Sequence, residues 1–356
     1  MKYLSAAAAA TLAVAVAAPL HAAPTLPGDL TGPQPRLAAT QLPDEANVAQ
    51  CAFDGDESTA YQSAGPARAN DALTLTLTEP AATSQVRVVV GDETGGRLAD
   101  GLVLELSTDG ETYGVSLPIE GAGVTYGLNA PLPLLAVRVR ATVDSDQPLI
   151  VRELWLTSQP GVPRIAYPFE VTVDAQAEDL AEWGAMARDE MMLWYPYFAE
   201  LLAGEAIQPP RHVKMVLREM DGVAYAGGGE IHGAAKWFRE HPDDVGAMIH
   251  EMIHVIQSYP RYDPGWLVEG LDDWARWWIY EPENRRPQAR PGGNYTDSYQ
   301  RTGAFLAWLE AYRAPGLMAK LNNAMRLNTY APELWVRWAG ADLDTLWAQY
   351  QASFEK

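Results

Sequence analysis

The pentapeptide His250-Glu251-Met252-Ile253-His254 constrains the fold of this chain more than any other stretch. Two histidines four positions apart on a helix lie about 40° from each other around the axis, so both imidazoles leave one face. A tetrahedral zinc ion accepts two nitrogen ligands in this arrangement. Glu251 follows the first histidine, where its carboxylate can take a proton from a metal-bound water. The motif therefore predicts a metal-activated hydrolase.

The residues around this HExxH motif have the pattern of a helix. Pro242 and the two following aspartates suit a first helical turn. Apolar side chains then recur at helical spacing; they are Val245, Met248, Ile249, Met252, Ile253 and Ile256. His250, His254 and Gln257 form a second stripe on the same helix. The alternative is a pair of ordinary histidines on a core helix, solvated or hydrogen-bonded.

A catalytic zinc ion usually takes a third protein ligand, and the chain after His254 contains no further histidine or cysteine. The third ligand must then be an oxygen donor. Gln257 and Pro260 stand where the metzincin spacing would place glycine and histidine, which excludes that subclass. In the next helical run, GWLVEGLDDWARWW, Glu269 lies among apolar residues. A carboxylate there is costly unless it is paired or binds metal.

Two more carboxylates follow Glu269 on the same run. Asp273, one turn later, can accept the free ring N–H of a ligating histidine and so fix its tautomer. Asp272 is the rival for the ligand position, and a solvated acidic face is the alternative for the whole group. We favour Glu269 as the third ligand.

Several ordered motifs between residues 162 and 354 resemble one protein family. They are HEMIHVIQ, WLVEGLDDWAR, SYQRTGAFLAWLE, the upstream GGGEIHGAAKWFREHPDDVGAMI and the closing LDTLWAQY. The resemblance is to the basic secretory protein family, zinc peptidases of plants and bacteria that are similar to the gluzincins. It implies His250, His254 and Glu269 as zinc ligands and Glu251 as the base.

The same resemblance implies a tyrosine beside the metal. A helix is predicted from Thr296 to Arg313, and the matching family segment places a tyrosine near its start, where this chain has Tyr299. A phenol near the zinc can stabilise the oxyanion of the tetrahedral intermediate. Tyr299 is therefore the candidate stabiliser, and Tyr295 is the alternative.

The region ahead of the HExxH helix is predicted to mix strands with one long helix. YPFEVTVD, HVKMVLREM and GVAYAGGGEIHGAA have strand patterns, and a helix is expected over 177–202. The third strand region could present its backbone to an extended substrate, with Gly228 and Gly229 allowing close approach and His232 facing the substrate. A glycine-rich hairpin loop and a structural histidine are the alternatives.

Residues 1–23 have the pattern of a cleaved secretory signal peptide, because Lys2 precedes an alanine-rich stretch that ends in small residues. Residues 24–40 are rich in proline and glycine, which is typical of a linker. No later apolar stretch is long enough to cross a membrane. We expect a secreted or periplasmic protein with no membrane anchor in its mature form.

Residues 41–160 contain short alternating runs separated by turn signals, which predicts an antiparallel β-sandwich. CAFDGDESTAYQS, LELSTDGETYG and VRVRAT with VRELWL resemble a discoidin-like (factor V/VIII C-type) domain, common as a carbohydrate-binding module. The resemblance implies a glycan ligand and a calcium ion near Asp54 and Asp56. The alternatives are a plain Asx turn and a domain that only braces its neighbour.

Composition limits the partners. The chain has 26 basic and 46 acidic residues, a formal net charge of −20, which repels phosphate backbones and argues against nucleic acid. Cys51 is the single cysteine, so no disulfide scaffold is expected. We expect its side chain to be a small buried one.

These observations together predict a two-domain protein. The discoidin-like sandwich, or jelly roll, over 41–160 precedes a mostly helical, zincin-like α+β domain over 161–356. The predicted function is that of a secreted zinc metallopeptidase acting on protein or peptide substrates. One alternative is an exported glycan-binding or adhesion protein with a non-catalytic metal site, against which the intact Glu251 argues. The other is a peptidase that its sandwich directs to glycoproteins.

Overall fold

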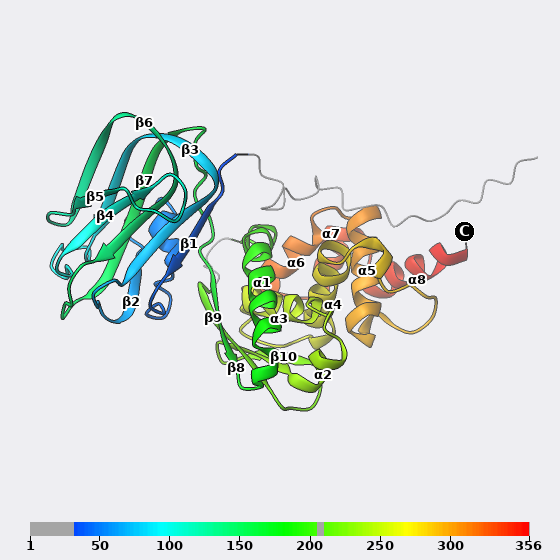
Figure 1. Ribbon diagram of the computed structural model, residues 1–356. Helices are drawn as coiled ribbons and strands as arrows, with labels where there is room; N and C mark the ends of the chain where they lie inside the picture. The colour runs from blue at the N-terminus through cyan, green and yellow to red at the C-terminus, as the bar shows by residue number, and fades with distance from the viewer. Residues whose placement is uncertain (1–31, 205–209, 356) are drawn as a thin grey trace, which may run out of the picture. The chain divides into compact units, whose positions relative to one another are not determined.

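The structure is a computed structural model that describes residues 32–204 and 210–355 (Figure 1). The predicted signal peptide lies outside the described residues, as does most of the predicted linker. The end of that linker forms strand β1 (Pro35–Ala39), because Leu37 and Ala39 pack against a hydrophobic core. No helix in the described ranges combines the length and the apolar character that crossing a membrane requires.

The described chain divides into two compact units. One contains residues 32–200 and 210–248, and the other contains residues 201–204 and 249–355. The predicted domain boundary after residue 160 does not coincide with this division and stays a prediction.

A seven-stranded antiparallel arrangement fills the first part of the chain, with strand order β2-β7-β3-β6-β4-β5 and with β1 also paired to β3. The remaining strands are β2 (Tyr61–Pro66), β3 (Ala72–Val90), β4 (Leu102–Ser107), β5 (Val115–Pro118), β6 (Gly123–Ala141) and β7 (Pro148–Gln159). A short 3-10 helix (Ala49–Phe53) precedes β2.

The two long strands, β3 and β6, belong to both layers of the sandwich. The first part of β3 pairs with β1 and with the end of β6, which in turn pairs with β4. The second part of β3 pairs with β7 and with the start of β6. The β3–β6 register shifts between Thr76 and Ala81 and again between Thr83 and Gln85. Such irregularities bend a strand, so each long strand passes from one layer to the other.

The core of the sandwich follows from the alternation along these strands. Leu73, Leu75 and Leu77 of β3 are buried, whereas Thr76 between them is exposed. Period-two alternation places every second side chain on the inner face, and each buried leucine contributes roughly 2 kcal/mol. The predicted antiparallel β-sandwich is confirmed.

A four-stranded mixed sheet follows, in the order β10-β11-β9-β8. Its strands are β8 (Glu170–Ala175), β9 (His212–Arg218), β10 (Ala224–Gly227) and β11 (Glu230–Ala234). Helix α1 (Ala181–Leu201) lies against this sheet, and helix α2 (Ala235–Glu240) follows it. A Cβ atom at Gly184 of α1 would lie 2.8 Å from Val173 and 2.9 Å from Leu217, so the glycine permits this close contact.

The rest of the chain is helical, as predicted. The helices are α3 (Gly246–Gln257), α4 (Gly265–Ala275), α5 (Tyr299–Tyr312), α6 (Leu317–Arg326), α7 (Glu333–Ala339) and α8 (Leu343–Ala352). Short helical turns also occur at Glu178–Leu180, Arg276–Tyr280, Glu283–Arg285, Tyr295–Asp297 and Ser353–Glu355. Helices α4 and α5 approach so closely that a Cβ atom at Gly270 would overlap Thr302. This contact fixes the helix that carries three carboxylates of the site described next.

Candidate metal centre

Helix α3 places two imidazoles and one carboxylate at the same site. Its apolar side chains Ile249, Met252 and Ile253 are fully buried. Burial of this face fixes the orientation of the helix about its own axis. The rings of His250 and His254 consequently leave one face, with centroids 5.1 Å apart and planes at 82°. Glu251, which lies between them in sequence, is 7% exposed.

Helix α4 supplies a carboxylate that faces both imidazoles. Glu269 Oε2 lies 3.1 Å from Nε2 of His250, and Glu269 Oε1 lies 3.8 Å from Nε2 of His254. The two Nε2 atoms therefore converge on one carboxylate group, which is itself 8% exposed.

The other nitrogen of each imidazole contacts an aspartate of the same helix. Nδ1 of His250 lies 2.9 Å from Asp273 Oδ1, and Nδ1 of His254 lies 2.5 Å from Asp272 Oδ2. Positions 269, 272 and 273 are separated by three and four residues, so their side chains share one face of α4. Sequence reasoning placed Asp273 beside a histidine but treated Asp272 only as a rival ligand. The position of Asp272, three residues after Glu269, was the sequence feature that could have indicated its contact with the second histidine.

His250, His254 and Asp272 form a cluster that could hold a metal ion, since one ligand atom from each lies within 4.8 Å of the others. Within residues 32–204 and 210–355, this is the one group of three or more such side chains that meets this spacing.

The charges of this centre are unusual for a buried site. Four carboxylates, those of Glu251, Glu269, Asp272 and Asp273, are almost fully buried around the two imidazoles. In the described part of the chain, none of the four pairs with a lysine or an arginine. Isolated buried charges are strongly disfavoured, so the arrangement calls for additional positive charge.

The pKa values respond to this environment. Burial raises the pKa of Asp272, and the neighbouring His254 offsets part of that shift. Burial also raises the pKa of Glu251, against the opposing charges of the two histidines. For His250, burial lowers the pKa but the bonds to Asp273 and Glu269 outweigh it, so the pKa lies well above its ordinary value. The pKa of His254 is raised for the same reason, chiefly by Asp272.

Two exposed tyrosines flank the cluster. The Tyr262 hydroxyl donates a hydrogen bond to Glu269 Oε1, and its ring centroid lies 6.3 Å from that of His254. The Tyr299 ring centroid lies 6.2 Å from that of His250. Burial, followed by the charges of Glu269 and Glu251, raises the pKa of Tyr299. Tyr262 was missed from sequence because its loop has no periodic pattern.

Tyr295, the alternative to Tyr299, is engaged elsewhere. Its hydroxyl donates to Asp344 Oδ1 over 3.1 Å, and its ring packs against Trp266 with centroids 5.2 Å apart. The structure therefore brings Tyr299, and not Tyr295, to the histidine rings.

The other predicted substrate contacts lie in the compact unit that includes residues 210–248. Gly228 and Gly229 form the turn between β10 and β11 with φ values of 63° and 83°, which favour glycine. Arg218 Nε donates to His232 Nδ1 over 3.3 Å, and Glu230 lies 3.0 Å from His232 Nε2. Both ring nitrogens thus have structural partners. A substrate-binding role for Gly228, Gly229 and His232 stays a prediction.

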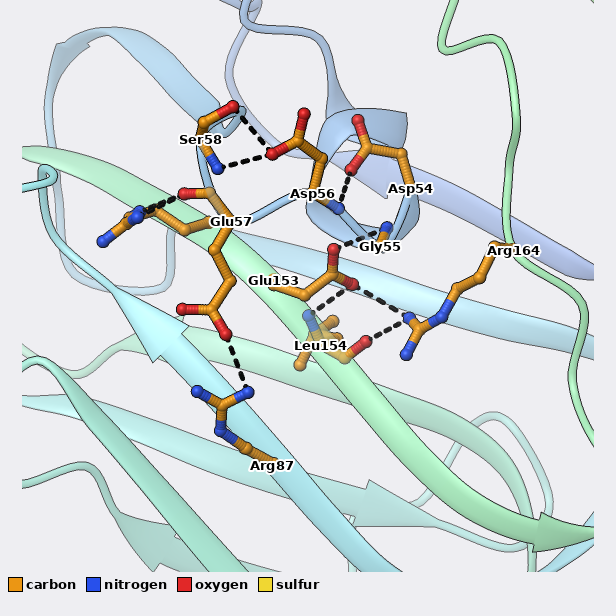
Figure 2. Close-up of polar contacts among 10 residues, drawn as sticks. Asp54, Gly55, Asp56, Glu57, Ser58, Arg87, Glu153, Leu154 and Arg164 are labelled. Atoms are coloured by element: carbon orange, nitrogen blue, oxygen red, sulfur yellow. Dashed lines mark hydrogen bonds and ion pairs between the residues drawn. The ribbon is translucent and has the colours of Figure 1, made fainter.

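The candidate calcium ligands lie in a turn of the sandwich (Figure 2). Asp54 Oδ1 accepts a hydrogen bond from the backbone of Asp56 over 2.9 Å, and Asp56 Oδ1 accepts one from the backbone of Ser58 over 2.9 Å. These are the bonds of Asx turns. The backbone N–H of Gly55 donates to Glu153 Oε2 over 2.7 Å. The turn is therefore held by protein donors, and a calcium ion at Asp54 and Asp56 stays a prediction.

Several solved structures match the chain over its N-terminal region. A CBM32 module from a family 31 glycoside hydrolase of Clostridium perfringens is 16% identical, with 38% of this chain and 97% of that chain covered and a TM-score of 0.30. The lectin domain of lectinolysin, complexed with Lewis B antigen, is 14% identical, with 34% of this chain and 90% of that chain covered and a TM-score of 0.30. A fucose-binding module of Streptococcus pneumoniae, SpX-3, is 11% identical, with 34% of this chain and 91% of that chain covered and a TM-score of 0.30.

No curated protein matches the chain. A family model does match residues 189–350, and its description is a peptidase of plants and bacteria, abbreviated BSP. This range contains α3, α4 and α5 and hence every residue of the histidine and carboxylate cluster. The predicted resemblance is confirmed over this range, and the part of the chain that builds the candidate metal centre is similar to the BSP peptidases of plants and bacteria.

Proposed function

We propose that this protein is a zinc metallopeptidase that hydrolyses peptide bonds with Glu251 as its general base. The observation that carries the proposal is the convergence of the Nε2 atoms of His250 and His254 on the Glu269 carboxylate, with Glu251 buried beside them. The match of residues 189–350 to a peptidase family supports the class of reaction.

The donor set fits a catalytic zinc ion. Two imidazole nitrogens and one carboxylate are a common ligand set for such an ion, and they leave a further position for water. A carboxylate accepts but does not donate, so Asp273 and Asp272 favour a proton on Nδ1 of each histidine. Nε2 then remains for the metal, as in other histidine-ligated zinc sites. A dication would also compensate the buried carboxylates.

Glu269 suits the third ligand position better than Asp272 does. The Asp272 carboxylate already contacts Nδ1 of His254, on the side of the ring away from Nε2. The Glu269 carboxylate faces the Nε2 atoms of both rings. We therefore assign His250, His254 and Glu269 as ligands and Asp272 and Asp273 as residues that orient the two imidazoles.

Bound zinc would supply Lewis-acid polarisation of the scissile carbonyl and of the attacking water. Glu251 takes the proton from this water as the oxygen attacks the carbonyl carbon. Glu251 then returns the proton to the amine nitrogen as the C–N bond breaks.

The two tyrosines have separate roles in this proposal. Tyr299 lies beside His250 with an exposed ring, from which its hydroxyl can donate to the carbonyl oxygen as negative charge develops there. Tyr262 donates to Glu269 and so orients the third ligand. The substrate is a protein or peptide, and the N-terminal signal pattern supports action in the periplasm or outside the cell.

Metal content and cleavage of an unfolded protein substrate, measured together, test the proposal. The mature chain and its Glu251→Gln variant should both bind one zinc ion, while kcat/KM falls by about 10³-fold or more in the variant. Glu240→Gln, at an exposed position of α2, is the matched control and should keep full activity. Zinc binding without cleavage by the native chain would favour the alternative of an exported binding protein.

A further inference from the structure

We infer that a pocket beside the metal centre binds a sugar residue, so that the substrate of the proposed peptidase is a glycosylated polypeptide. The inference rests on the proposed function and adds the class of substrate. The pocket has a volume of about 530 Å³, within the usual range for ligand sites. Its lining includes Arg261, Asp263, Trp266, Tyr295, Asn328 and Tyr330.

The pocket begins next to the ligand-bearing face of α4. Trp266 and Glu269 are three residues apart on this helix, so their side chains are neighbours on its surface. Tyr262, whose hydroxyl contacts Glu269, lies between the two lining residues Arg261 and Asp263 in the chain. A polypeptide bound at the metal centre could therefore place a group attached to one of its residues into this pocket.

The aromatic walls of the pocket are fixed before any ligand binds. The indole of the buried Trp335 donates to the Tyr330 hydroxyl over 3.0 Å, and the Tyr295 hydroxyl donates to Asp344 over 3.1 Å. Trp266 packs edge-on against Tyr295. Rigid rings offer flat apolar surface at little entropic cost, and one face of a pyranose ring, which carries C–H groups, fits such a surface.

The polar lining carries both signs of charge. Arg261 and Asp263 are exposed, and neither forms a hydrogen bond or an ion pair with another residue in the described ranges. A charged amino-acid side chain would be repelled by one of the two. A sugar hydroxyl both donates and accepts, so neighbouring hydroxyls can bond to the carboxylate and to the guanidinium. Asn328 and Thr296 add donors and acceptors to the same lining.

A titration with free sugars tests the pocket without requiring catalysis. The zinc-loaded Glu251→Gln variant of the mature chain is titrated with neutral hexoses and N-acetylhexosamines, and binding is followed by tryptophan fluorescence. At least one sugar should bind saturably, and a further Asp263→Ala or Arg261→Ala substitution should weaken that binding at least tenfold. Arg290→Ala, at an exposed loop position outside the pocket, should not change it. Absence of saturable binding would overturn the inference, as would binding that survives both pocket substitutions and therefore occurs elsewhere in the chain.

A pair of substrates then separates this inference from the proposed function. The active chain should cleave a glycopeptide with a kcat/KM at least tenfold above that for the same peptide without sugar. Asp263→Ala should lower kcat/KM for the glycopeptide to the value that the same variant shows for the plain peptide, with zinc content unchanged. Equal cleavage of both peptides by the native chain would overturn the sugar pocket and leave the peptidase standing. If a zinc-loaded chain cleaves neither, the peptidase proposal fails, and the substrate class inferred here fails with it.

Discussion

Buried carboxylates in the sandwich have arginine partners, whereas those of the candidate metal centre lie around two histidines and, at Glu269, accept from a tyrosine hydroxyl. Glu105 lies 2.6 Å from Arg138 and 2.7 Å from Arg140. Glu153, which is fully buried, lies 2.9 Å from Arg164 (Figure 2). The carboxylates of α3 and α4 have no such partner among the residues that the structure describes.

The two regions balance the charge of their buried carboxylates in different ways. In the sandwich, arginine side chains pair with the buried carboxylates, and the bonds around Glu153 connect a turn, strand β7 and the segment that follows it. In the metal centre, four carboxylates surround two imidazoles that carry at most two positive charges. An uncompensated buried charge costs several kcal/mol, and in the described residues no lysine or arginine compensates these carboxylates, which is consistent with the proposal that a metal ion binds here.

Removal of a ligand charge should have the largest effect. Glu269→Gln keeps the shape of the side chain but takes away the carboxylate that faces both Nε2 atoms. Zinc affinity should fall more than about 100-fold, beyond the usual effect of a residue that only supports a ligand. Competition with a chromogenic chelator measures this. A zinc affinity equal to that of the native chain would exclude Glu269 as a ligand.

In the sandwich, stability should depend on pH through Glu153. Burial raises the pKa of this carboxyl to about 7, although Arg164 opposes the shift. Between the ordinary value of 4.5 and about 7, the folded state holds a proton that the unfolded chain has released. The free energy of unfolding should therefore fall by at most about 3 kcal/mol as pH rises through this window.

Urea unfolding followed by near-ultraviolet circular dichroism, at pH values from 4.5 to 8, checks this dependence. Glu153→Gln should show a flatter profile than the native chain. Glu105→Gln is the comparison, because bonding to Arg140 lowers the pKa of Glu105. Removal of this carboxylate should change the pH dependence of stability only at more acidic pH values. If the free energy of unfolding depends on pH with the same slope in the native chain and in Glu153→Gln, the pKa of Glu153 is not raised, and the prediction is wrong.

The two aspartates of the metal centre should have intermediate effects. Asp272→Asn and Asp273→Asn leave each imidazole with a partner of similar shape but without charge, so zinc affinity should fall about 10- to 100-fold. Asp221→Asn, at an exposed turn, is the control. A larger loss for Asp272→Asn than for Glu269→Gln would reverse the assignment and make Asp272 the ligand.

The smallest effect is expected at Tyr299. Tyr299→Phe removes one hydroxyl from an exposed ring and should lower kcat about tenfold, with little change in KM or zinc content, since the hydroxyl acts only as charge develops on the carbonyl oxygen. Steady-state kinetics on one peptide check this, with Tyr312→Phe as an exposed control. An unchanged kcat would exclude the phenol from oxyanion stabilisation.

Local patterns in the sequence predicted the elements that carry the site. Apolar periodicity and the two histidines defined α3, and the alternating runs of residues 41–160 defined the sandwich. The same patterns could not show that β3 and β6 each run through both layers, because their bends interrupt the alternation at Thr76 and Ala81. They also could not show that β1 pairs with a distant strand, since its five residues carry a weak pattern.

The contacts between elements explain what was missed in the site. Sequence spacing placed Glu269, Asp272 and Asp273 on one helical face, but the rotation of α4 relative to α3 decides which oxygen meets which imidazole nitrogen. That rotation depends on the close approach of α4 to α5 at Gly270. Tyr262 lies in a loop, whose path no periodicity describes.

Calorimetric titration of zinc into the metal-free mature chain shows whether α3 and α4 together bind a zinc ion. The carboxylate excess predicts one tight site per chain, with binding that is lost in His250→Ala and retained in Glu251→Gln. No binding by the native chain, or equal binding by His250→Ala, would contradict the claim that α3 and α4 form a zinc centre.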